Sequence, residues 1–123
     1  MKSALNWFEI PVVELPRATK FYEAILKTSL HQERFGDTDL AILRADEPGT
    51  SGALVRDPKR KPNADGTLVY LNANGQLDRV LGRVAEAGGA VLVGKTDIGG
   101  PGFIAIIRDT EGNQVGLHSE RAA

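Results

Sequence analysis

The order of predicted secondary-structure elements occurs twice along this chain, and such an internal repeat constrains a fold more than any single motif. In the first half, an apolar run over residues 4–13 predicts a strand. Apolar residues then recur at helical spacing between Leu15 and Leu26, which predicts an amphipathic helix. Three further strands are predicted at residues 30–35, 40–44 and 52–56. The first half therefore has the order βαβββ.

The second half shows the same order. An apolar strand is predicted at residues 67–73, and an amphipathic helix follows from Leu77 to Ala87, where Gly88 and Gly89 end it. Three more strands are predicted at residues 90–94, 103–108 and 114–118. The two halves therefore share an order of elements rather than a pattern of residues.

These two repeats predict an α+β fold in a single domain over residues 1–123. We place repeat one at about 1–58 and repeat two at about 66–123, with a linker at about 59–65. The linker lies in a polar segment that contains two prolines and three consecutive basic residues. A ferredoxin-like α+β fold, which also begins with a strand, a helix and a strand, is the main alternative.

The composition limits the possible partners. The 15 Lys and Arg residues and 16 Asp and Glu residues give a formal net charge of −1. This charge offers no electrostatic attraction to nucleic acid or to an anionic membrane, so we expect neither partner. No apolar run resembles a signal peptide or reaches membrane-spanning length. The absence of cysteine excludes disulfides, thiolate nucleophiles and cysteine-ligated metals, and it agrees with a cytoplasmic location.

Three local motifs resemble those of one protein family. They are Ile10-Pro11-Val12-Val13-Glu14-Leu15-Pro16-Arg17-Ala18 with Phe21-Tyr22 and Ile25-Leu26, then Ala87-Gly88-Gly89-Ala90, and then Arg108-Asp109-Thr110-Glu111-Gly112-Asn113-Gln114-Val115. In this order and spacing they are similar to the opening, the second helix end and the C-terminal turn of the vicinal oxygen chelate superfamily. That superfamily includes glyoxalase I, extradiol dioxygenases and bleomycin-resistance proteins. Thr110 stands where the family commonly has proline.

The resemblance implies two cup-shaped mixed sheets, a homodimer, and a metal and a ligand held inside the cups. It places four metal ligands on the first and last strands of each repeat. The matching residues here are Trp7, about Gly52, Leu68 or Val69, and Gly116. None of these side chains can bind a metal. We therefore predict no metal cofactor, and a rewired divalent site that uses Glu9 and His118 is the less favoured alternative.

Side chains two residues apart share a face of a sheet. Starting from the four matched positions, this alternation predicts which other residues line the ligand cup. The predicted ligand-binding residues are Trp7, Glu9, Leu54, Arg56, Tyr70, Asn72 and His118. The glycines at 52 and 116 are expected to leave room in the cup. Glu9 on an apolar strand needs a partner, and we expect a salt bridge to Arg56 or Arg108.

The resemblance and the vacated metal positions together predict a function. We expect the protein to bind a small, partly apolar molecule in its cup, as the drug-sequestering members of the superfamily do. The alternative is a lyase, isomerase or dioxygenase-like enzyme of the same superfamily. Such an enzyme would be metal-independent, with Glu9 and His118 as acid and base, or would use the rewired divalent site.

Overall fold

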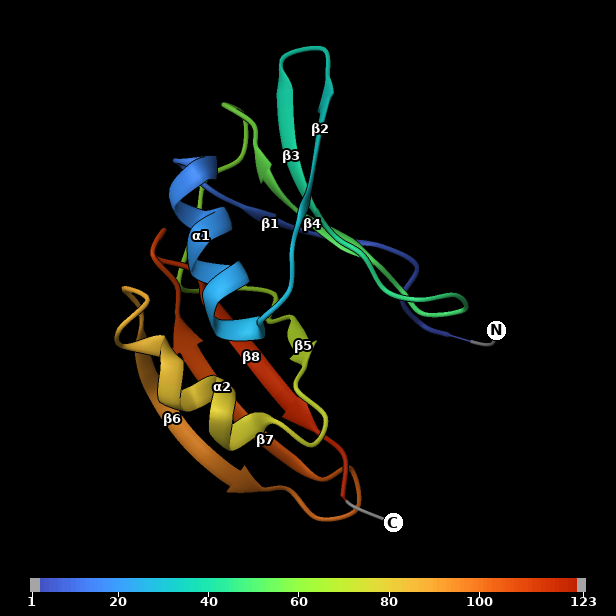
Figure 1. Cartoon of the computed structure of the whole chain (residues 1–123), viewed down its shortest axis with the longest axis vertical. Coiled ribbons are helices and arrows are strands. Elements are labelled where there is room, and N and C mark those ends of the chain that lie inside the picture. Colours follow the sequence, from blue (N-terminus) through green and yellow to red (C-terminus); the bar gives the residue numbers. More distant parts are fainter. Residues whose placement is uncertain (1–2, 122–123) are drawn as a thin grey trace.

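Each repeat folds into one four-stranded mixed sheet with one helix, as Figure 1 shows. The computed structural model describes residues 3–121 of the chain. In repeat one, sheet A has the strand order β1-β4-β3-β2, and α1 connects β1 to β2. Its elements are β1 (Phe8–Pro11), α1 (Leu15–Leu26), β2 (His31–Phe35), β3 (Thr38–Leu43) and β4 (Gly52–Arg56).

Sheet B repeats this arrangement with the strand order β5-β8-β7-β6, and α2 connects β5 to β6. Its elements are β5 (Tyr70–Asn72), α2 (Leu77–Val84), β6 (Ala90–Asp97), β7 (Phe103–Arg108) and β8 (Gln114–Ser119). In both sheets the first strand pairs in parallel with the last, and the other pairs are antiparallel. The predicted α+β class and the two βαβββ repeats are confirmed.

Both helices and one face of each sheet pack into a single apolar core. From α1, the residues Ala18, Phe21, Tyr22 and Ile25 are at most 1% exposed. The shorter α2 contributes Leu77, Val80 and Val84. Figure 1 shows sheet A in the upper half of the view, sheet B in the lower half, and the two helices near their junction. Among the described residues no helix is long and apolar enough to cross a membrane.

Each sheet has a helix-covered face and a helix-free face. In sheet A the helix-covered face carries Ile10, Ala41 and Leu54, which belong to the shared core. The helix-free face of sheet A carries Glu9 and a small separate cluster that consists of Leu40, Ile42, Ala53 and Val55. The helix-free face of sheet B carries Tyr70, Asn72, Ile104, Ile106, Gly116 and His118.

Strand pairing sets the ends of the strands, and several of them differ from the sequence prediction; β5, for example, is Tyr70–Asn72 rather than residues 67–73. β1 is shorter than the predicted apolar run because its partner β4 begins at Gly52, opposite Phe8. β6 continues past its predicted end at Gly94 to Asp97, which pairs with Phe103 after two register shifts. Hydropathy alone did not locate these ends, because they depend on the length of the neighbouring strand.

Candidate ligand-binding site

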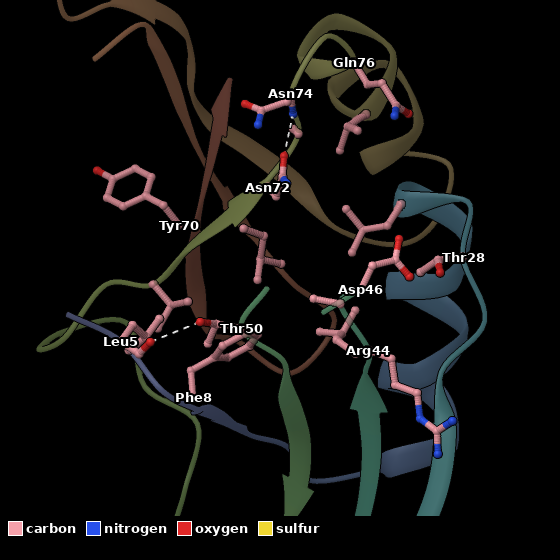
Figure 2. Close-up of a pocket in the computed structure, with 17 residues that line it drawn as sticks. Leu5, Phe8, Thr28, Arg44, Asp46, Thr50, Tyr70, Asn72, Asn74 and Gln76 are labelled. Carbon is pink, nitrogen blue, oxygen red and sulfur yellow. Dashed lines mark hydrogen bonds between the residues drawn. The ribbon is translucent and has the colours of Figure 1, made fainter. Parts of the chain in front are cut away.

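A cavity of about 610 Å³ lies between the two repeats, and Figure 2 shows the residues that line it. Its apolar floor consists of core-facing side chains from both repeats, namely Phe8, Leu26, Leu43, Val69, Leu71 and Val80. Its rim is polar and includes Thr28, Arg44, Asp46, Thr50, Asn72, Asn74 and Gln76. An apolar floor with a few polar groups at the rim is typical of a small-molecule site. We call it the inter-repeat cavity.

Two walls from different parts of the chain enclose the inter-repeat cavity. β5 has only one neighbour in sheet B, which is β8, and residues of β5 form one wall of the cavity. The end of α1 and the loop after β3 form the opposite wall, and Figure 2 shows Thr28 and Asp46 on that side. The Thr50 hydroxyl donates a hydrogen bond to the Leu5 carbonyl at 3.0 Å, which connects this loop to the segment before β1.

Two of the predicted ligand-binding residues, Tyr70 and Asn72, line the inter-repeat cavity. The Asn72 side-chain oxygen accepts a hydrogen bond from the Asn74 N–H at 2.8 Å, which fixes the turn between β5 and α2. The Tyr70 side chain is 43% exposed, and Figure 2 shows it pointing away from the other labelled residues. Tyr70 therefore lies at the margin of the cavity, and Asn72 lies on its rim.

Trp7 immediately precedes β1 and Glu9 lies within β1, and both are outside the inter-repeat cavity. The Trp7 indole N–H donates to the Glu9 carboxylate at 3.3 Å, and Arg60 forms a salt bridge with the same carboxylate at 3.3 Å. The partner expected for Glu9 was Arg56 or Arg108, and that expectation is wrong. Arg60 belongs to the run of three basic residues in the linker. From the sequence alone, this run was interpreted only as part of a polar linker.

Leu54 and Arg56 lie on the opposite face of sheet A from the one expected. The parallel register pairs Glu9 with Ala53 and Ile10 with Leu54, so Leu54 shares the helix-covered face. Leu54 is 0% exposed within the shared core. Arg56 forms a salt bridge with Asp39 at 3.3 Å. The prediction placed Gly52 rather than Ala53 on the open face, and that shift of one residue reverses every side chain of a strand.

His118 lies on the helix-free face of sheet B, where its Nε2 makes a 2.7 Å hydrogen bond with the Pro101 carbonyl. Glu9 and His118 belong to different sheets, and each bonds to other partners. Within the described chain they make no hydrogen bond or salt bridge with each other. The acid–base role of this pair therefore stays a prediction.

Aromatic rings fill the space next to both glycines at the vacated metal positions. A Cβ atom added to Gly116 would lie 2.3 Å from the Tyr70 ring, and one added to Gly52 would lie 2.3 Å from the Phe8 ring. In each case the ring belongs to the residue paired with that glycine on the parallel neighbour strand. The glycines thus leave no open room, because the neighbouring rings lie directly against the backbone.

The described side chains supply few groups that bind metals. Among residues 3–121 no group of three or more His, Cys, Asp or Glu side chains is close enough to hold a metal ion. A protein site for a divalent ion normally uses at least three such ligands at fixed geometry. The donor set of a single chain therefore does not fit the metal site that the family resemblance implies.

The C-terminal motif forms a buried polar cluster that connects the two repeats. The Glu111 carboxylate accepts hydrogen bonds from the Val13 N–H at 2.9 Å and from the Glu14 N–H at 2.8 Å, just before α1. It also accepts one from Arg17 Nε at 2.7 Å. Asp109 accepts a hydrogen bond from the Tyr22 hydroxyl at 2.7 Å. We call this set of residues the acidic clasp.

Hydrogen bonding keeps the Glu111 carboxylate ionised although its side chain is buried. Burial alone would raise the pKa of the Glu111 carboxyl, but hydrogen bonds from Arg17, the Glu14 and Val13 N–H groups and the Thr110 hydroxyl lower that pKa to about 2. Burial beside Asp109 raises the pKa of the Tyr22 hydroxyl well above its usual value. From the sequence alone this motif predicts a turn and carries part of the family resemblance. Its two acids, next to apolar strands, were the available signal for a structural role.

Comparison with known proteins identifies the family of this chain. The model of the Glyoxalase/Bleomycin resistance protein/Dioxygenase superfamily matches residues 4–117. The chain belongs to this superfamily. That result confirms the vicinal oxygen chelate resemblance of the sequence motifs. No curated protein gives a significant match.

Solved structures of the superfamily share this fold. A glyoxylase/bleomycin resistance protein/dioxygenase domain from Frankia sp. EAN1pec is 20% identical with a TM-score of 0.74, over 97% of this chain and 98% of that one. TnmS3, an antibiotic binding protein from Streptomyces sp. CB03234, is 23% identical with a TM-score of 0.68, over 97% of both chains. A glyoxalase I mutant from Zea mays is 25% identical with a TM-score of 0.69, over 94% of this chain but 46% of that one.

Proposed function

We propose that this superfamily member binds a small, partly apolar molecule in the inter-repeat cavity and needs no metal to do so. The cavity itself carries the proposal, because its volume of about 610 Å³ suits a small organic molecule. The structure of TnmS3, an antibiotic binding protein, supports small-molecule binding as a use of this fold. Tyr70 and Asn72 are the predicted ligand residues that we retain for this site.

The shape of the lining favours a molecule with an apolar body and a polar end. Leu71 and Val80 are buried core residues whose side chains also face the cavity, and Phe8 and Leu43 pack beside them. Burying apolar ligand surface there contributes roughly 25 cal/mol per Å² before the cost of association. The amides and hydroxyls of the rim are then available to the polar end of the ligand.

Filling the cavity is expected to weaken binding of an apolar probe. Ala45 lines the cavity and is exposed, so Ala45→Trp places an indole at the entrance with little cost to folding. We expect the Kd of the neutral fluorescent dye N-phenyl-1-naphthylamine to rise about tenfold, since a loss of about 1.4 kcal/mol is a factor of ten. Fluorescence titration measures this change. Ala64→Trp, on the exposed linker, is the matched control and should bind like the wild type.

The same titration tests independence from metal. Adding a chelator such as EDTA is expected to leave dye affinity unchanged, because the lining contains a single carboxylate and no histidine. Loss of binding with chelator, restored by a divalent ion, would contradict the metal-free proposal. An effect of Ala64→Trp equal to that of Ala45→Trp would instead contradict the location of the site.

A cytoplasmic location stays a prediction that rests on the absence of cysteine.

We further propose that the protein forms a homodimer through its helix-free sheet faces. Ile42, Ile104 and Ile106 on these faces are only half-buried, and Val93 is 42% exposed. Light scattering is expected to give a mass of twice the 13.2 kDa chain. Ile104→Arg should lower that mass to the monomer's, whereas Ile98→Arg, at an exposed turn residue, should not. A monomeric wild type would contradict this proposal and leave the cavity proposal intact.

A further inference from the structure

We propose that the inter-repeat cavity selects ligands that carry a positive charge beside an apolar body, and that Asp46 recognises this charge. The inference rests on the proposed function, because it names a ligand class for the same cavity. The class is a lipophilic ammonium compound. Two observations support it, namely the free carboxylate at the rim and the neutral opposite wall.

Asp46 supplies the only negative side-chain charge in the lining. Arg44 and Asp46 are its two charged residues. Figure 2 shows the Arg44 side chain running away from the other labelled residues, whereas Asp46 turns toward Thr28. Within residues 3–121 the Asp46 carboxylate takes part in no salt bridge and accepts no side-chain hydrogen bond. A ligand cation at the rim would therefore meet a carboxylate that has no internal partner.

The C-terminal end of α1 lies on the same side of the cavity as Asp46. Leu26, the last residue of the helix, and Thr28 both line the cavity. The last carbonyls of a helix carry partial negative charge, but Lys27 is the C-cap of α1. Arg83 of α2 also donates to the Ile25 carbonyl at 3.0 Å, so cations of the protein already offset the charge of this helix end. We therefore attribute the charge preference to Asp46 and not to the end of α1.

The opposite wall does not favour an anion. β5 and the turn after it contribute only neutral side chains, among them Asn72, Asn74 and Gln76. The N-terminal end of α2 carries partial positive charge, but Asp78 in its first turn offsets that charge. An anionic ligand would thus find Arg44 alone, whose side chain points away. The charge distribution of the cavity therefore favours a cationic end near α1 and an apolar body against Leu71 and Val80.

Three probes that differ only in one end group test the proposal. They are 4-phenylbutylamine, 4-phenylbutan-1-ol and 4-phenylbutanoate, titrated by calorimetry at low ionic strength. Because Asp46 is exposed, the amine is expected to bind only about fivefold more tightly than the alcohol, and the carboxylate least tightly. Asp46→Asn should abolish the preference for the amine and leave the affinity of the alcohol unchanged. Asp37→Asn, in the turn between β2 and β3, makes the same change of charge and should keep the preference.

Each outcome decides one of the two proposals. Tightest binding of the carboxylate, or an amine preference that survives Asp46→Asn, would overturn the role of Asp46. Equal binding of all three probes, weakened by Ala45→Trp, would overturn the charge preference and keep the proposed function. If none of the probes binds and Ala45→Trp also leaves dye binding unchanged, both proposals fail.

Discussion

Replacing Glu111 with glutamine is expected to lower the free energy of unfolding at neutral pH by roughly 3 kcal/mol. The Glu111 side chain is 0% exposed, and its pKa of about 2 lies well below the ordinary 4.5. That difference measures how strongly the folded protein prefers the ionised form. A neutral glutamine amide forfeits the charge-assisted bond to Arg17 and leaves that guanidinium without its buried partner. Urea unfolding followed by circular dichroism measures the loss.

The same substitution should remove a defined part of the pH dependence. The pKa of Glu111 is lower in the folded than in the unfolded chain, so its contribution is complete above about pH 4.5. The contribution is lost as the pH falls from about 4.5 toward 2. The wild type should therefore lose more stability across this window than Glu111→Gln does. Glu47→Gln, at an exposed loop position, is the control, and equal losses in both variants would show that the acidic clasp contributes little.

Replacing Gly52 with alanine is expected to destabilise the protein by about 2 kcal/mol. The new Cβ would lie 2.3 Å from the Phe8 ring, which is half-buried and packs against the shared core. The ring must then leave its position, and the core loses its contacts. Thermal and urea unfolding measure the effect. Adding Phe8→Ala to Gly52→Ala should cost less than the sum of the two single changes, because the second change removes the clash.

Gly82→Ala provides the matched control for this substitution. Gly82 lies inside α2, and an added Cβ there would meet no atom within 4 Å. Alanine at this position should stabilise the helix by about 0.5–1 kcal/mol. If Gly52→Ala proved as harmless as Gly82→Ala, the close packing of Phe8 against β4 would be refuted.

The sequence predicted the fold well because its signals are local. Both the helical spacing from Leu15 to Leu26 and the turns between strands depend on residues that are close together in the sequence. The order of elements then left few possible topologies. Strand ends were less predictable, since β1 begins only at Phe8, opposite the first residue of β4. The pairing register of the strands was the least predictable feature. The predicted register of β4 was shifted by one residue, so Leu54 was expected on the wrong face of sheet A.

The candidate site was only partly predictable for a related reason. Alternation along a strand indicates which residues share a face, but not which surfaces lie next to a cavity. The floor of the inter-repeat cavity joins Leu43 of one repeat to Leu71 and Val80 of the other. Asp46 lies in a loop that no periodic pattern describes. Such juxtapositions arise from the packing of the repeats, which no local pattern encodes.

The acidic clasp also has a consequence for how the chain folds. Glu111 and Asn113 of repeat two bind backbone groups at residues 11–14, where β1 passes into α1 of repeat one. An isolated first repeat would leave those groups without partners, and its helix would lack the α2 side of the core. The two repeats should therefore unfold in one cooperative transition. The order of elements is duplicated along the chain, but we expect neither repeat to be stable without the other.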